Sequence, residues 1–252
     1  MIPEMLHRLS ECFGWKSKAV TQESHESETP PDMEPEFLNI YSLCKPFTII
    51  SIERMYALYK AALYVSMNTI SGDIVECGVW KGGSVMLMAM TLLARGDVRD
   101  IYLYDTFAGM SEPSDKDVDY LGNRALDSWW GNGKNSQWSV TVVSLDDVRT
   151  NLAMTQYPSD KLHYIEGKVE DTIPRVLPES IAVLHLDTDW YASTYHELNH
   201  LFQRLVRGGV LVIDDYGHHK GAREATDRYL KEHSVPMLLH RVDYTGRVGM
   251  KL

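Results

Sequence analysis

Short apolar runs and helix-like patterns alternate along most of this 252-residue chain. Short runs bounded by Gly, Asp or Ser are typical of buried strands, and apolar residues three or four apart are typical of helices. The predicted strands cover residues 73–77, 100–104, 161–165, 181–186 and 209–213. The predicted helices between and after them cover residues 84–94, 193–206 and 221–231.

Strands that alternate with helices predict βαβ units and therefore a mostly parallel sheet covered on both faces. The end of the chain, 236–252, predicts two closing strands around the turn sequence DYTG. We therefore expect an α/β fold with a Rossmann-like, doubly wound, mostly parallel sheet and an antiparallel C-terminal strand pair. Ligands of such sheets bind beyond the carboxyl ends of the strands.

Two segments lack this pattern. The first part of the chain is predicted to be an N-terminal helical arm or lid, 1–45, followed by the main domain, 46–252. Within the arm, 21–36 is acidic and contains a Pro pair, which is typical of a flexible linker. A long stretch rich in Ser, Asp, Gly and Asn, 110–139, is predicted to be a lid over the ligand, because loops of this length are commonly lids.

Composition narrows the function. The formal net charge of -10 argues against a nucleic-acid or anionic-membrane binder, since either needs a basic surface. The three cysteines, Cys12, Cys44 and Cys77, lack paired or metal-type spacing, which indicates a reducing compartment. No signal-like or membrane-spanning apolar run is present, so we expect a cytoplasmic protein.

The first predicted strand ends in a Gly-rich turn that opens a helix. Gly78 and Gly82 allow a tight turn and close approach of a ligand, and Ser84 can cap the helix. Glu76 would repel a pyrophosphate but suits the ammonium group of an amino acid. Asp105 ends the second strand, where an acid can accept hydrogen bonds from ribose hydroxyls. Together they favour a nucleoside with an amino-acid tail, although an ordinary turn and a capping Asp105 remain alternatives.

Carboxylates follow the next two predicted strands. Asp187 and Asp189 end the fourth strand, and Asp214 and Asp215 end the fifth. Neighbouring strands lie about 5 Å apart, so the acids crowd together unless a cation neutralises them or one is protonated. Oxygen ligands without Cys suit magnesium or calcium better than zinc. The alternative is that these acids cap helices or face solvent.

Two histidines and several tryptophans are further candidates. His218 and His219 follow the fifth strand closely, and each is either a base, a substrate contact or a solvated loop residue. The tryptophans can line an acceptor pocket or simply pack: Trp80, Trp129, Trp130, Trp138 and Trp190.

Taken together, the stretches GDIVECGVWKGGS, IYLYDTFAGM, LHLDTDWYASTYHEL and GGVLVIDDYG resemble the macrocin/mycinamicin-type O-methyltransferase family. The likeness extends over 46–229, and the spacing of the first stretch is also similar to that of catechol-type methyltransferases. The resemblance implies a homo-oligomeric enzyme of antibiotic or other natural product biosynthesis. Such an enzyme transfers a methyl group from S-adenosylmethionine to a sugar hydroxyl of a natural product or nucleotide-sugar.

The resemblance also implies roles for individual residues. The cofactor-binding set is Ser51, Arg54, Glu76, Cys77, Gly78, Gly82, Ser84, Asp105, Thr106, Gly167, Val169, Glu170 and Asp187. The ligands of Mg²⁺ are Asp187, Asp214 and Asp215. Of the cofactor set, Ser51 is also predicted from the pattern to cap a helix over 51–66, with Arg54 exposed.

The chemistry follows from the acceptor. A sugar hydroxyl is a poor nucleophile, and coordination to a divalent cation lowers its pKa. Asp187 is the predicted proton acceptor, with His218 and His219 as alternates. Three other functions compete with methyl transfer. They are a metal-dependent glycosyltransferase that uses Asp187-x-Asp189, an NAD-dependent dehydrogenase and a non-catalytic S-adenosylmethionine-binding protein.

Overall fold

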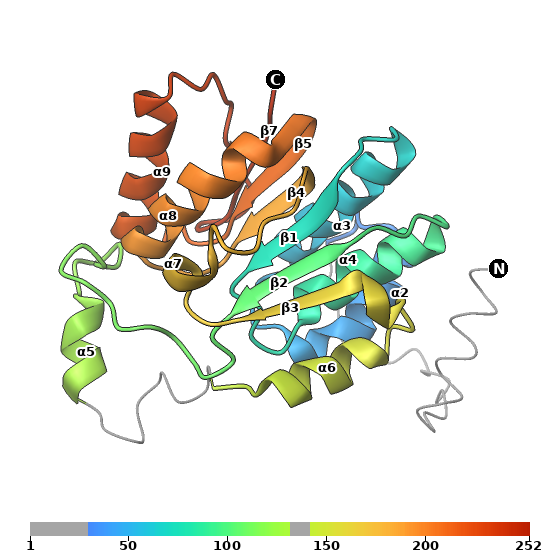
Figure 1. The fold of residues 1–252 in the computed structure, drawn as a ribbon, viewed down its shortest axis with the longest axis horizontal. Helices are drawn as coiled ribbons and strands as arrows, with labels where there is room; N and C mark the ends of the chain where they lie inside the picture. Colours follow the sequence, from blue (N-terminus) through green and yellow to red (C-terminus); the bar gives the residue numbers. More distant parts are fainter. Residues whose placement is uncertain (1–29, 132–141) are drawn as a thin grey trace.

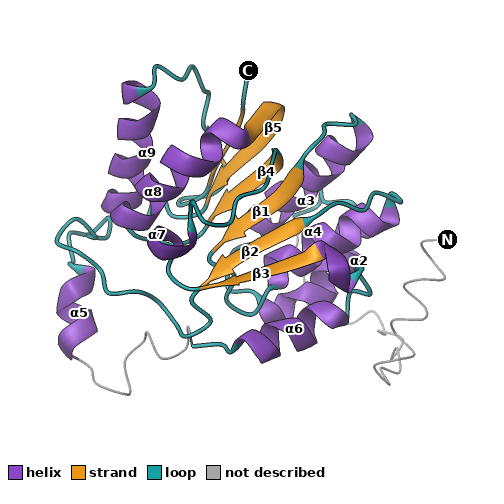
Figure 2. Ribbon diagram, viewed as in Figure 1, coloured by secondary structure: helices purple, strands orange, loops and turns teal. Residues whose placement is uncertain are grey.

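A mostly parallel sheet runs through the middle of the molecule, with helices on both of its faces (Figures 1 and 2). The computed structural model describes residues 30–131 and 142–252. In these residues the strand order is β3-β2-β1-β4-β5-β7-β6. The first five strands of the chain are parallel, and β7 runs antiparallel to both β5 and β6. The strands are β1 Asp73–Cys77, β2 Ile101–Asp105, β3 Leu162–Glu166, β4 Ile181–Leu186, β5 Leu205–Ile213, β6 His240–Arg241 and β7 Arg247–Met250.

Two hydrophobic clusters hold the helices against the two faces of the sheet. One face is covered by α2 Pro35–Cys44, α3 Ile52–Met67, α4 Gly83–Ala94 and α6 Leu145–Ala153. The other face is covered by α7 Val169–Thr172, α8 Tyr191–Leu201 and α9 Lys220–Glu232. Short 3₁₀ turns occupy Lys45–Phe47, Ser159–Lys161 and Phe202–Arg204, and α5 Ala125–Gly131 lies apart from both layers (Figure 1).

The predicted fold is confirmed, including the antiparallel pair at the end of the chain. Burial on both faces explains why β4, with every residue buried, reads as a continuous apolar run. The predicted cap of α3 is also confirmed, because the side chain of Ser51 accepts a hydrogen bond from the backbone N–H of Arg54. The predicted helix over 193–206 was too long, since the chain tightens into a 3₁₀ turn after Leu201.

Helix α6 was not predicted, although a local signal for it exists. Ser144 and Asp147 form a capping box, in which each side chain meets the other residue's backbone N–H. The pattern S-x-x-D therefore marked the start of this helix. The helix is mostly polar, so apolar periodicity does not reveal it.

Part of the predicted arm packs into the body of the protein. Phe37 and Ile40 of α2 are buried, and the ring of Phe37 contacts those of Tyr56 and Tyr59 on α3. Residues 1–29 lie outside the described residues, and with them the predicted N-terminal helix, most of the linker, and Cys12. The same holds for 132–141 of the predicted lid, including Trp138. No helix in the described ranges is long and apolar enough to cross a lipid bilayer.

Candidate active site

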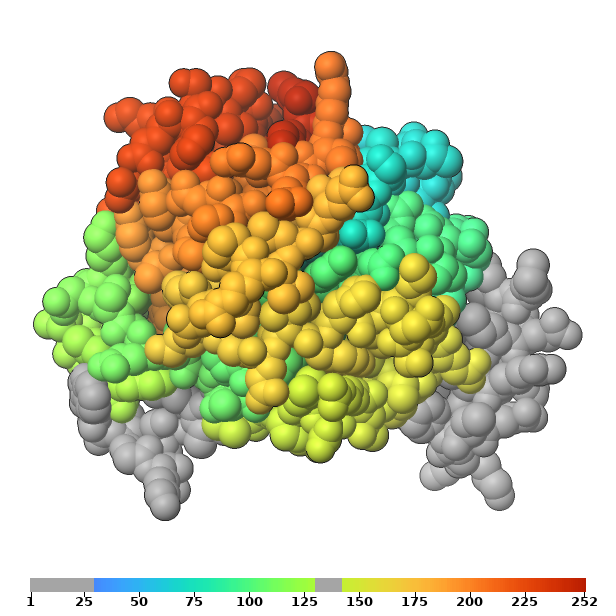
Figure 3. Space-filling model, viewed as in Figure 1, coloured from blue at the N-terminus to red at the C-terminus, as the bar shows by residue number. Residues whose placement is uncertain are grey.

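The carboxyl ends of β1, β2, β4 and β5 open into a cavity of about 960 Å³. The described part of the predicted lid and the turn between β6 and β7 also line this cavity. An antiparallel backbone bridge between Asp119 and His219 joins the lid to the loop after β5. Figure 3 shows the green lid segment beside the orange and red C-terminal part of the chain. Segments that are far apart in sequence therefore enclose one site.

The turn after β1 is built around Gly78 and tied down by Asp105. Gly78 has a positive φ of 84°, and a Cβ there would lie 2.0 Å from the carbonyl oxygen of Asp187. Both backbone N–H groups of Val79 and Trp80 donate to Oδ2 of Asp105, at 2.6 and 3.1 Å. Asp105 thus shapes the turn directly, in addition to lining the cavity.

Ser84 does not cap α4, contrary to the prediction. Gly82 takes the N-cap position with a left-handed backbone, and the helix begins at Gly83. Ser84 lies inside the first turn, and its hydroxyl donates to Oε1 of Glu76. The other oxygen of Glu76, Oε2, is buried without a hydrogen-bond partner among the described residues. This acid is fully buried behind Ser84, which itself lines the cavity.

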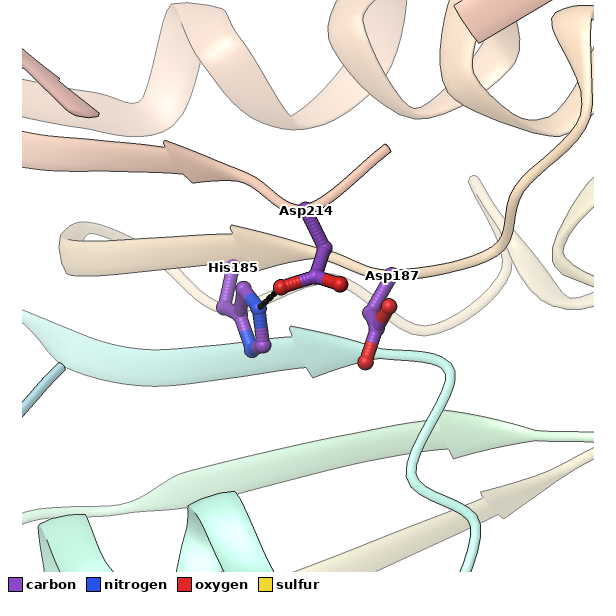
Figure 4. A group of neighbouring side chains, drawn as sticks. All are labelled: His185, Asp187 and Asp214. Carbon is purple, nitrogen blue, oxygen red and sulfur yellow. Dashed lines mark ion pairs between the residues drawn. The ribbon is translucent and has the colours of Figure 1, made fainter. Parts of the chain in front are cut away.

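A buried imidazole lies between two carboxylates of the site. Nδ1 of His185 is 3.6 Å from Oε1 of Glu76, and Nε2 is 3.8 Å from Oδ1 of Asp214. Figure 4 shows His185, Asp187 and Asp214 side by side at the ends of β4 and β5. Burial lowers the pKa of His185, but the charges of Glu76 and Asp214 outweigh burial and raise it to about 9. The ring is therefore positively charged near neutral pH.

The carboxylates predicted as metal ligands all line the cavity but fall into two groups. Ligand atoms of His185, Asp187 and Asp214 lie within 4.8 Å of one another, and so do those of Asp189, Asp215 and His219. Asp215, which was predicted to bind Mg²⁺ together with Asp187 and Asp214, therefore also lies next to Asp189.

The donor set nevertheless fits a hard divalent cation. Oδ1 of Asp214 and Oδ2 of Asp215 are buried and lack hydrogen-bond partners among the described residues. Burial, and then the charges of Asp214, Asp215 and Asp189, raise the pKa of Asp187 well above its ordinary value. Crowded acids whose oxygens lack partners are what a bound Mg²⁺ would neutralise.

Arg54 is mostly buried, whereas the pattern predicted it to be exposed. Only 13% of its side chain is accessible, and its Nη1 pairs with Oδ2 of Asp214. Its Nε lies 3.0 Å from Oδ2 of Asp243, which also accepts a hydrogen bond from Ser51 at 2.8 Å. The exposure of Arg54 was predicted wrongly because its partners are distant in sequence. Asp243 was recognised only as part of a turn.

The two predicted histidines have different surroundings. Nε2 of His219 lies 3.2 Å from Oδ1 of Asp189, and His219 is buried. His218 lies in an aromatic cluster instead. Its Nδ1 is 3.1 Å from the hydroxyl of Tyr244, and its ring centroid is 5.4 Å from that of Tyr120. Both tyrosines are exposed, and the sequence patterns did not single out either of them.

Most of the residues predicted for the site line the cavity, and a few do not. Those that line it are Arg54, Gly78, Ser84, Asp105, Thr106, Gly167, Val169, Glu170, Asp187, Asp214, Asp215, His218 and His219. Four others are not among the lining residues: Ser51, Glu76, Cys77 and Gly82. Most of the predicted set is thus gathered around one space.

Comparison with known proteins gives consistent matches. A sequence model of the macrocin-O-methyltransferase (TylF) family matches residues 42–249. Demethyldecarbamoylnovobiocin O-methyltransferase of Streptomyces niveus is 31% identical over 201 residues, which cover 79% of this chain and 73% of that protein. The 8-demethyl-8-(2,3-dimethoxy-alpha-L-rhamnosyl)-tetracenomycin-C 4'-O-methyltransferase of Streptomyces olivaceus is 31% identical over 217 residues, 86% of this chain and 80% of that protein.

A solved structure agrees with these matches. The structure of the O-methyltransferase NovP superimposes with a TM-score of 0.69 and is 28% identical. The match covers 81% of this chain and 82% of that one. The structural similarity therefore includes most of the described fold, and the residues that line the cavity all lie within the range matched by the family model.

Proposed function

This chain belongs to the macrocin O-methyltransferase family of S-adenosylmethionine-dependent enzymes, and we propose that it methylates a hydroxyl of a sugar-bearing small molecule with the help of Mg²⁺. The predicted family resemblance and the predicted enzyme class are confirmed. The observation that carries the finer proposal is the convergence of four carboxylates, from β4 and β5, on the cavity that opens at the turn after β1.

The side of the cavity next to β1 and β2 suits the methyl donor. Glu76 is a buried acid behind Ser84, and its Oε2 has no hydrogen-bond partner within the described ranges, which suits the ammonium group of the methionine part. Asp105 closes β2, where a ribose would lie in this type of sheet. The acidic walls also favour the positive charge of the sulfonium. These features support S-adenosylmethionine over a dinucleotide, whose pyrophosphate Glu76 would repel.

The opposite side of the cavity suits metal-assisted activation of the acceptor. Asp187, Asp214 and Asp215 would hold the Mg²⁺. When bound, the ion would lower the pKa of the acceptor hydroxyl and fix the orientation of that hydroxyl. The protein's own residues then take the proton. Asp187 and Asp189 both line the cavity, and His219 contacts Asp189 at 3.2 Å. We add Asp189 to Asp187 as a candidate proton acceptor. In this arrangement His219 holds the carboxylate of Asp189 in place.

An aromatic cluster supports a sugar as the acceptor. Tyr120, His218 and Tyr244 come from the lid, the loop after β5 and the turn between β6 and β7. Aromatic faces bury the apolar C–H faces of a sugar, and hydroxyl and imidazole groups bond its oxygens. One relative is named for a rhamnosyl tetracenomycin, which is a sugar-bearing substrate. We extend this substrate class to the present chain.

Calorimetric titration with S-adenosylhomocysteine, with and without Mg²⁺, tests the proposal directly. We expect S-adenosylhomocysteine to bind and a nucleotide-sugar such as UDP-glucose not to compete with it. Methyl transfer to sugar-bearing natural products should then require added Mg²⁺ and stop on its removal by a chelator. Full activity after chelation would reject the metal, and absence of S-adenosylhomocysteine binding would reject the cofactor.

A further inference from the structure

The carboxylate cluster already contains a permanent cation from the protein itself. The guanidinium of Arg54 pairs with Asp214. Burial lowers the pKa of Arg54, but the charges of the surrounding carboxylates, that of Asp214 first, outweigh burial and raise it. Arg54 reaches this place from α3, which precedes every strand of the sheet. Its position beside a predicted metal ligand is therefore created by packing, since 160 residues separate Arg54 from Asp214.

We propose that Arg54 competes with the divalent cation for Asp214. In this inference, which rests on the proposed metal-dependent function, Arg54 neutralises Asp214 in the metal-free protein. It withdraws to Asp243 when the metal binds. Arg54 is thus a positioning residue that keeps the carboxylates assembled and sets how tightly the metal is held.

The two oxygens of Asp214 explain the competition. Oδ1 is turned into the sheet toward His185, and the other oxygen lies on the side of Asp187 (Figure 4). That second oxygen, Oδ2, is the one that pairs with Arg54. A metal held between Asp187 and Asp214 would draw on the oxygen that lies on the side of Asp187. Two cations on this oxygen repel each other, so each weakens the other's hold on Asp214.

Asp243 offers Arg54 a second partner that is already in contact. Nε of Arg54 lies 3.0 Å from Oδ2 of Asp243. The other oxygen of Asp243 accepts hydrogen bonds from the backbone N–H groups of Thr245 and Gly246, at 2.9 and 2.6 Å, which fix its orientation. A Cβ at Gly246 would lie 2.9 Å from Cγ and Cδ of Arg54, so the absence of a side chain at Gly246 leaves room for the Arg54 side chain. Arg54 can release Asp214 and keep this ion pair.

Metal titration of two variants tests whether Arg54 competes with the metal for Asp214 or helps to hold the metal. The probe is Mn²⁺ or Mg²⁺ alone, measured by calorimetry without any acceptor. We expect Arg54→Gln to bind metal more tightly, on the order of tenfold, the size of a typical coupling between two ligands. We expect the same variant to melt at a lower temperature when no metal is present. Asp243→Asn should weaken metal binding, because Arg54 then keeps its hold on Asp214.

Arg99→Gln is the matched control. The Arg99 side chain is also 13% exposed and pairs with Asp97, but it precedes the amino end of β2, away from the cavity. This variant should lose stability without a change in metal affinity.

Two results overturn the inference. Equal metal binding by Arg54→Gln would show that Arg54 does not compete with the metal, and weaker binding would show that it supports the metal. Unchanged binding by Asp243→Asn would do the same if Arg54→Gln failed to fold. A wild-type protein that binds neither ion would overturn the metal-dependent function itself, so the two failures are distinguishable.

Discussion

Glu76 and His185 occupy paired positions on the adjacent parallel strands β1 and β4, with Oε1 of Glu76 3.6 Å from Nδ1 of His185. The other ring nitrogen faces Asp214 at 3.8 Å. One buried ring therefore lies between the acid assigned to the methionine part of the cofactor and a carboxylate assigned to the metal. This arrangement makes the charge of His185 a determinant of stability.

The contribution of His185 to stability should depend on pH. Its pKa of about 9 in the folded protein exceeds the value of about 6.5 expected in the unfolded chain. The stabilisation is therefore complete below about pH 6.5 and lost as the pH rises through about 9. We expect His185→Gln to lower the free energy of unfolding more at about pH 6 than at about pH 9.5, measured by urea unfolding. An equal loss at both pH values would contradict a charged ring.

Replacing a metal-site carboxylate should abolish metal-dependent turnover. Asp187→Asn and Asp214→Asn each remove a charged oxygen ligand, so we expect at least a roughly hundredfold loss of methyl transfer, with the fold retained in circular dichroism. Asp227→Asn, on the exposed face of α9, is the control and should retain activity. Activity unchanged in both site variants would remove these acids from the mechanism.

Asp105 should matter more for the cofactor than for the acceptor. Its carboxylate holds the N–H groups of Val79 and Trp80, and an amide in its place offers fewer acceptor sites and no charge. We expect Asp105→Asn to weaken S-adenosylhomocysteine binding about tenfold, measured by calorimetry. Asp100→Asn, at the opposite end of the same strand, should leave that affinity unchanged. A larger effect on the KM of the acceptor would argue against the ribose assignment.

The proton acceptor can be identified by comparing kcat among three variants. If Asp189 takes the proton, Asp189→Asn should lower kcat by about 10²–10⁴, the usual contribution of a general base. His219→Asn should lower kcat less, since it removes the contact at 3.2 Å that orients Asp189 and leaves the Asp189 carboxylate in place. His218→Ala should mainly raise the KM of the acceptor. The largest loss of kcat in the His218 variant would instead assign the base to that imidazole.

Tyr244 should contribute to acceptor binding through its ring. Removing the ring in Tyr244→Ala takes away one face of the aromatic cluster, whose centroids lie 5.9 Å apart for His218 and Tyr244. We expect the KM of the acceptor to rise about five- to tenfold, in line with about 1 kcal/mol for an aromatic contact. Tyr244→Phe keeps the ring and should stay near the wild-type KM. A similar KM in all three proteins would exclude a stacking role.

The sequence by itself determined the layers of the fold and the edge at which the site forms. Burial on both faces makes each central strand a short apolar run, so the alternation of strands and helices is visible in the chain. Parallel strands end at a common edge, so Asp105, Asp187 and Asp214 had to meet there once β2, β4 and β5 were recognised. The family motifs coincide with these strand ends for the same reason.

Only the tertiary structure decided which oxygen faces which partner. Arg54 was predicted to be exposed, yet it pairs with Asp214 and Asp243, 160 and 189 residues away. Asp215 was predicted as a metal ligand with Asp187 and Asp214, and the structure also places one of its oxygens within 4.8 Å of ligand atoms of Asp189 and His219. Periodicity specifies the face of an element that a residue occupies. Side-chain pairing depends on how elements far apart in sequence pack in space, and no local pattern carries that information.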